Sequence, residues 1–118
     1  MNSDSSEPFH VTMAQARAGM PGPDKDNYVV PLRHGTLELG LYAPRGQDDQ
    51  TPHTRDELYI VMRGTGWFRN GPVRHRFAPG DALFVPARVD HRFEQFSDDL
   101  ELWVVFYGPE GGEKRIED

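Results

Sequence analysis

Hydrophobic and polar residues alternate over short distances in the middle of the chain. Leu37, Leu39 and Leu41 are separated by Glu38 and Gly40, which is the two-residue period of a strand with one buried face. Further short segments of this kind follow, with glycine, proline or aspartate between them. The expected strands are YVVPLRH, TLELGLYAP, ELYIVMRG, GWFRN, VRHRFAP, DALFVPA, HRFEQF and LELWVVFYG. About eight short strands without a convincing long helix indicate an all-β sandwich or barrel.

The two ends of the chain differ from this alternating part. Residues 1–8 are predicted to form a disordered polar tail, and residues 109–118 a polar C-terminal tail. A single domain is therefore expected at residues 9–108. Within it, residues 9–13 are a possible short strand, and helix is expected only at about residues 13–18.

Composition narrows the classes of partner. A chain of 118 residues has room for one domain and one site. The sequence contains no cysteine, which excludes disulfides, thiolate nucleophiles and cysteine-bound zinc. A net charge of −6 argues against nucleic-acid or anionic-membrane partners. No signal peptide or transmembrane segment is evident. We therefore expect a cytoplasmic protein whose partner is a small-molecule ligand or substrate.

His53 and Glu57 lie four residues apart at the start of an expected strand. On one straight strand they would be ~13 Å apart, too far to share a metal ion whose ligands lie ~2.0–2.2 Å away. A helix would bring them together, but residues 58–62 are rich in β-branched and aromatic residues, and Pro52 precedes them. A bend at residues 54–56, between a strand that ends at His53 and one that begins at Glu57, remains possible. The alternative is an ordinary surface pair.

A second polar group lies in the stretch PGDALFVPARVDHRFEQF, residues 79–96. A Gly-Asp turn precedes the apolar strand at residues 82–85, Pro86 ends it, and a short turn leads to His91. The alternation of a strand places His91, Phe93 and Gln95 on one face. Taken alone, His91 is expected to be a solvated histidine.

Together the two stretches resemble the cupin family. Its first motif contains glycine, His-x-His, glutamate and glycine, and its second contains glycine, proline, glycine, histidine and asparagine. The matching residues are Gly46, Pro52, His53, Glu57 and Gly64 in the first motif and Gly80, Pro86 and His91 in the second. The resemblance covers residues 35–107 and implies a double-stranded β-helix, or jelly-roll barrel.

Three positions depart from the family pattern. Thr51 stands at the first histidine, Arg88 at the second-motif glycine and Gln95 at the asparagine. The resemblance therefore implies a ligand set of His53, Glu57 and His91 for one divalent ion, which could be iron, manganese, nickel or zinc. Thr51 is expected outside the direct ligands or linked to the ion through water.

Several other residues have expected places around this site. Thr51, Tyr59, Phe93 and Gln95 are expected to line the pocket, and Arg63 and Arg88 are weaker candidates for holding an acidic substrate. The histidines and aspartates expected at the surface or in loops are His10, His34, His75, Asp48, Asp49, Asp98 and Asp99.

Three classes of function are compatible with these residues. The first is a mononuclear-metal enzyme that acts on a small oxygen-bearing molecule by dioxygenase, isomerase or lyase chemistry. The second is a non-catalytic module that binds or senses a small molecule, and the third is an interaction protein with a vestigial site. Glu57 favours the first class, because an inward-facing carboxylate is costly unless it is paired or coordinated. Its catalytic residues stay unassigned.

A homodimer is the expected assembly. A short jelly roll leaves sheet edges with unpaired backbone groups, which must be covered or paired. Residues 9–13 supply extra β-prone chain for this purpose, and two-fold pairing is the commonest arrangement of soluble oligomers.

Overall fold

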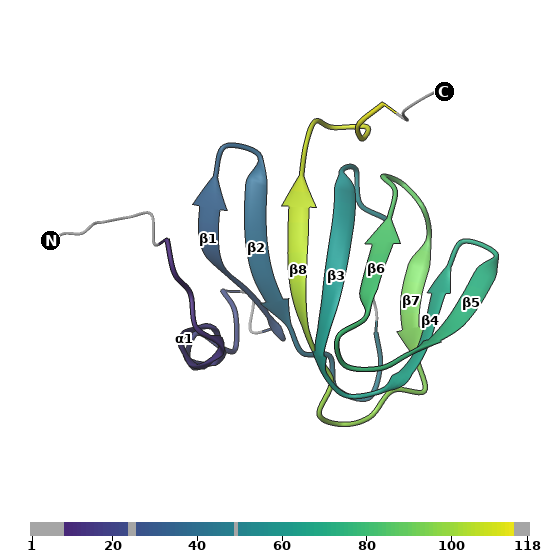
Figure 1. Cartoon of the computed structure of the whole chain (residues 1–118), viewed down its shortest axis with the longest axis horizontal. Helices are drawn as coiled ribbons and strands as arrows, with labels where there is room; N and C mark the ends of the chain where they lie inside the picture. The colour runs from purple at the N-terminus through teal and green to yellow at the C-terminus, as the bar shows by residue number, and fades with distance from the viewer. Residues whose placement is uncertain (1–8, 24–25, 49, 115–118) are drawn as a thin grey trace, which may run out of the picture.

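The computed structural model describes residues 9–23, 26–48 and 50–114. The predicted tail at residues 1–8 lies outside these ranges. The described chain contains one helix and eight strands (Figure 1). In chain order they are α1 (Met13–Ala18), β1 (Tyr28–His34), β2 (Leu37–Tyr42), β3 (Asp56–Arg63), β4 (Gly66–Asn70), β5 (Val73–Phe77), β6 (Ala82–Val85), β7 (His91–Glu94) and β8 (Glu101–Tyr107). The predicted strands and the short helix are confirmed.

The strands form two antiparallel sheets. The larger has the order β1-β2-β8-β3-β6, and the smaller has the order β5-β4-β7. Figure 1 shows the first sheet running from β1 to β6, with β7, β4 and β5 beyond it. Strand neighbours such as β3 and β8 are distant in sequence, so the sheet brings together residues from both halves of the chain. No helix in the described residues has the length and apolar character needed to cross a membrane.

The alternating leucines of β2 face away from the barrel interior. Gly40, between them, pairs with the buried Val104, whereas Leu41 pairs with Trp103. Leu41 is nevertheless fully buried, because it packs with Ala16 of α1 and Val29. The alternating pattern therefore predicted the strand, but its buried leucine, Leu41, packs against helix α1 on the outer face of the sheet.

Helix α1 is fixed at both ends. Thr12 and Gln15 form a capping box at its start, and Arg17 makes two hydrogen bonds to Glu101 of β8, of 2.9 and 2.8 Å. The possible strand at residues 9–13 is absent: residues 10–12 have no regular structure and Met13 opens the helix. The reason is local, since the Thr12 cap starts a helix where a strand would have continued.

The chain after β8 is held against the barrel as far as Glu113. Gly111 donates a backbone hydrogen bond to the Thr54 carbonyl, and Glu113 donates one to Asp56. The other oxygen of Asp56, which is only 5% exposed, accepts from the Ala87 backbone. The predicted polar tail thus begins as a bound segment that helps to position the start of β3, and residues 115–118 lie outside the described ranges.

One end of the barrel interior is a packed apolar core. Tyr59 and Val61 point inward from β3, because strand alternation places them on the same face as the buried Glu57. The buried cluster consists of Tyr59, Val61, Phe68, Phe77, Val85, Phe93, Leu100, Leu102 and Val104.

Candidate functional site

The three predicted metal ligands come from two parts of the chain that the fold brings together. Glu57 is the second residue of β3, and His91 is the first residue of β7. His53 lies in the irregular segment before β3 and not at the end of a strand as expected, but a bend at residues 54–55 does turn it back toward Glu57. Its ring packs edge-on against Phe106, at 4.8 Å between ring centroids, which holds it beside the barrel opening.

Their donor atoms converge on one point. His91 Nε2 lies 3.1 Å from Glu57 Oε1, and His53 Nε2 lies 3.6 Å from the same oxygen. One donor atom from each residue lies within 4.8 Å of the other two. Two ligands bound ~2.1 Å from one ion at a right angle would be ~3.0 Å apart, and ~4.2 Å apart if opposite. The separations of 3.1 and 3.6 Å from Glu57 Oε1 therefore fit ligands of a single ion.

Two of these atoms are buried without a hydrogen bond. Within the described residues, Glu57 Oε1 and His91 Nε2 have no hydrogen-bond partner. They are 3.1 Å apart, but they are not aligned as donor and acceptor. A buried polar group left unpaired costs ~1–3 kcal/mol. A cation between them would satisfy both, so the residues present fit a bound metal ion.

The second nitrogen of His91 sets its orientation. Nδ1 lies 2.9 Å from the Val89 carbonyl oxygen and can only donate to it, which leaves the lone pair of a neutral ring on Nε2, facing the site. Burial alone would lower the pKa of His91, but Glu57 and the Val89 hydrogen bond outweigh burial and raise it. Burial lowers the pKa of His53, with Glu57 acting against it. His91 therefore binds a proton more readily than a free histidine does, and His53 binds one less readily.

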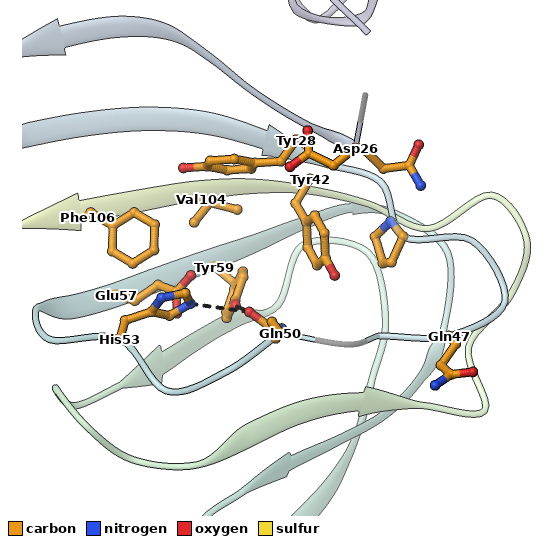
Figure 2. A pocket seen from close by; sticks show the side chains of 12 residues that line it. Asp26, Tyr28, Tyr42, Gln47, Gln50, His53, Glu57, Tyr59, Val104 and Phe106 are labelled. Carbon is orange, nitrogen blue, oxygen red and sulfur yellow. Dashed lines mark hydrogen bonds and ion pairs between the residues drawn. The ribbon is translucent and has the colours of Figure 1, made fainter. Parts of the chain in front are cut away.

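A cavity of about 420 Å³ opens beside this cluster (Figure 2). This volume lies within the ~300–1,000 Å³ range of small-molecule pockets. Its polar lining consists of Asp26, Asn27, Gln47, Gln50, His53, Glu57 and the three tyrosines Tyr28, Tyr42 and Tyr59. Pro44, Val104 and Phe106 supply its apolar wall. The space therefore combines an apolar wall with several hydrogen-bonding groups, next to the candidate metal site.

Tyr59 is the one of the four expected pocket residues that lines this cavity. Thr51 is exposed and Phe93 is 1% exposed in the core, where its ring packs on those of Tyr59 and Phe68. Gln95 leaves the strand with a φ of +48° and accepts a hydrogen bond from Arg74 on the outside. Strand alternation fails for Gln95 because β7 ends at Glu94.

The two arginines proposed to hold a substrate are also outside the cavity lining. Arg63 and Arg88 are both exposed. Arg88 stands where the family motif has glycine, and its backbone does adopt a left-handed φ of +69°. A backbone hydrogen bond from Arg88 to the His53 carbonyl ties the second-motif turn to the first-motif segment. The three histidines expected at the surface, His10, His34 and His75, are exposed.

Asp48 and Gln50 are site residues that the sequence did not reveal. Asp48, expected to be a loop charge, is 1% exposed. Its carboxylate accepts hydrogen bonds from the Tyr42 hydroxyl, the Phe93 backbone and the Gln50 side chain, of 2.7, 2.8 and 2.7 Å. Gln50 in turn contacts Tyr59 and His53. The sequence offers no signal for this, because Asp48 and its neighbours have the composition of a polar loop.

Comparisons with known proteins agree with this architecture. A family model described as a cupin domain matches residues 39–107. An uncharacterized protein of Streptomyces coelicolor is 39% identical over 85 residues, which cover 70% of this chain and 81% of that protein. A solved structure from Thermus thermophilus has 27% identity and a TM-score of 0.60, covering 73% of this chain and 86% of that one.

A more distant structure supports the fold alone. A cupin superfamily protein of Desulfitobacterium hafniense has 13% identity and a TM-score of 0.62, covering 86% of this chain and 94% of its own. The two antiparallel sheets accordingly form an all-β jelly roll, to which the short helix α1 is added. With the family model matched over more than half of its length, the chain belongs to the cupin family.

Proposed function

We propose that this cupin binds one divalent metal ion through His53, Glu57 and His91 and acts on a small oxygen-bearing molecule in the adjoining cavity. The observation that carries the proposal is the pair of buried, unpaired atoms, Glu57 Oε1 and His91 Nε2, which within the described residues face the same point as His53 Nε2. The reaction would be of dioxygenase, isomerase or lyase type. The candidate ions are iron, manganese, nickel and zinc, which histidine and carboxylate ligands accept.

The bound ion would supply Lewis-acid chemistry or a place for dioxygen. The chain's own residues have distinct tasks around it. Val89 keeps the Nδ1 proton on His91, and therefore keeps Nε2 free for the site. Burial raises the pKa of Tyr59 well above its usual value, so its hydroxyl remains protonated and acts as a hydrogen-bond donor. Glu57, as a ligand, would be ionised and unsuited to donate a proton.

The cavity supports an oxygen-bearing substrate. Within the described residues the Tyr28 hydroxyl is buried and has no hydrogen-bond partner, and Tyr28 lines the cavity. Burial, followed by the charges of Glu38 and Glu57, raises its pKa above the ordinary range, which keeps the proton on this oxygen. A ligand oxygen would give that hydroxyl an acceptor, while Val104 and Phe106 contact the carbon skeleton.

The second candidate is a non-catalytic module that binds or senses a small molecule. The cavity favours it, because tyrosine hydroxyls and an apolar wall bind a ligand whether or not a reaction follows.

A cytoplasmic homodimer is also part of the proposal. Within the described residues β1 and β6 are the edges of the larger sheet, and the exposed Met62 and Phe84 add apolar surface on β3 and β6.

The test begins with metal-free protein made without an affinity tag. It is reconstituted with iron(II), manganese(II), nickel(II) or zinc(II), and oxygen uptake and product formation are followed over diketones, hydroxy acids and sugars. We expect about one ion per chain, turnover that requires it, and loss of both in a His53→Ala/His91→Ala variant. Turnover in metal-free protein, or full metal content in the double variant, would contradict the proposal. Metal binding without turnover on any compound would favour the binding module.

A further inference from the structure

The side chain of Gln50 is directed into the candidate metal site. Its Oε1 lies 3.3 Å from His53 Nε2 and 2.9 Å from the Tyr59 hydroxyl oxygen. Figure 2 shows the Gln50 side chain turned toward His53 and Tyr59. The separation of 3.3 Å falls between the 3.1 and 3.6 Å that relate Glu57 Oε1 to the two histidines. It also matches the ~3.0 Å expected of neighbouring ligands on one ion.

We propose that Gln50 Oε1 is a fourth protein ligand for the metal ion, pre-oriented by Asp48. This inference rests on the proposed metal site and deepens it. It completes a set of two imidazoles, one carboxylate and one carboxamide oxygen. Thr51, the residue at the position of the family's first histidine, is exposed and does not line the cavity, so the preceding residue provides the ligand.

Asp48 determines which end of the amide faces the site. A carboxylate accepts hydrogen bonds and donates none. Because Asp48 Oδ2 lies 2.7 Å from Gln50 Nε2, the NH₂ group must point to Asp48 and the oxygen to the site. Asp48 is itself held by the Tyr42 hydroxyl and the Phe93 backbone. The carboxamide oxygen is therefore positioned before any ion arrives.

Gln50 Oε1 has the capacity to bind an ion while keeping its contact with Tyr59. A carbonyl oxygen has two lone pairs, and the Tyr59 hydroxyl uses one of them. The other faces His53 Nε2, which can donate a proton to it in the metal-free protein. Metal binding requires a deprotonated imidazole nitrogen. A cation would then take the place of the shared proton, with both atoms as ligands.

A carboxamide oxygen also bears on the choice of ion. Carbonyl and carboxylate oxygens suit manganese, whereas imidazoles suit zinc, copper, iron and nickel. Replacement of a third imidazole by Gln50 shifts the ligand set toward oxygen. Manganese(II) is therefore the appropriate probe for this ligand.

The experiment compares manganese(II) binding by the full-length chain and its Gln50→Leu variant. Leucine fills a similar volume and offers no ligand atom. Affinity is measured by calorimetry, and water-proton relaxation of the loaded protein counts exchangeable bound waters. We expect the variant to bind about 100-fold more weakly, the upper end of the range for groups that support a metal site, and to gain about one bound water. Gln95→Leu is the matched control, because Gln95 is an exposed glutamine outside the cavity lining whose side chain contacts Arg74, and the manganese affinity of this variant should match the parent's.

The outcomes separate this inference from the proposed function. If the parent binds no divalent ion, the metal site itself is wrong. If the parent binds manganese and Gln50→Leu does so equally well, only the Gln50 ligand is wrong. Weaker binding without an added water would assign Gln50 a positioning role and would overturn the inference. Thermal unfolding of the variant is recorded, and Gln50→Ala provides the same test if the leucine variant does not fold.

Discussion

The two ends of the barrel interior are built from the same strands but have opposite chemistry. On β3, Glu57 lies at the site and Val61 lies in the core; on β7, His91 lies at the site and Phe93 in the core. On the inward face of each strand, a candidate ligand and a core side chain are thus only two to four residues apart. Rigid strands that are anchored in a close-packed core hold the candidate ligands of the other end in position.

The polar end pairs its buried groups through a chain of hydrogen bonds. Asp48 binds Gln50, and Gln50 binds Tyr59 and contacts His53. This chain stops at Glu57 Oε1 and His91 Nε2, which stay unpaired among the described residues. The buried side chains of the apolar end are hydrocarbon apart from the Tyr59 hydroxyl, which is paired with Gln50. The difference shows that unsatisfied polarity is concentrated where a ligand is proposed to bind.

The largest effect is expected from Phe93→Ala at the apolar end. Phe93 is 1% exposed and its ring packs on those of Tyr59, Phe68 and Phe77. Loss of this ring should lower the free energy of unfolding by about 3–5 kcal/mol, measured by urea denaturation. Phe84→Ala is the control, because Phe84 is 46% exposed and its change should stay under ~1 kcal/mol. If the two substitutions lowered the free energy of unfolding equally, packing of Phe93 in the core would not be a main source of stability.

Asp48→Ala tests the junction between the two ends. It removes the acceptor for the Phe93 backbone in the core and for Gln50 at the site. Each buried donor left unpaired costs ~1–3 kcal/mol, so unfolding should become easier by about 2–4 kcal/mol. Manganese affinity should fall as well. Asp98→Ala, which changes an exposed aspartate outside the site, should leave both quantities unchanged; a normal affinity in Asp48→Ala would contradict the proposed orienting role.

Glu57→Gln should separate stability from function at the polar end. The neutral amide removes a buried charge from the position of Oε1, which has no hydrogen-bond partner among the described residues. The metal-free variant should therefore gain about 1 kcal/mol of stability, while stoichiometric metal binding is lost. Thermal unfolding without metal and metal analysis after reconstitution measure the two effects. A variant that is less stable than the metal-free parent would show that the buried carboxylate does not destabilise the metal-free protein.

The smallest effect is expected outside both ends, where Arg17 of α1 binds Glu101. The hydrogen bonds from Arg17 lower the pKa of Glu101, and burial acts against them. A carboxyl group with a lowered folded-state pKa stabilises the fold at pH values above its ordinary range near ~4.3, and this contribution is lost as pH falls through the lowered value. Urea unfolding across this acidic range should show the loss in the parent and a weaker pH dependence in Glu101→Gln. Identical profiles would exclude the pair as its source.

Sequence alone determined the features that depend on local periodicity and on motif spacing. Two-residue alternation predicted the strands, including β2, because successive side chains point to opposite faces of a strand whichever strand lies next to it. The helix at residues 13–18 was predicted as well. Matching the two motifs singled out His53, Glu57 and His91, whose donor atoms the fold brings within 4.8 Å of one another. These features required no knowledge of remote contacts.

Only the tertiary structure decided the places of Asp48, Gln50 and Phe93. Asp48 and Gln50 lie in an irregular segment whose conformation depends on partners more than forty residues away, such as the Phe93 backbone. Phe93 shares an inward face with His91 but lies on the core side of the cavity, because alternation specifies a face and not a depth along the barrel. Alternation also could not place Gln95, which leaves the strand at a positive φ. Loop burial and depth are set by packing across the two sheets, and no local pattern in the chain records them.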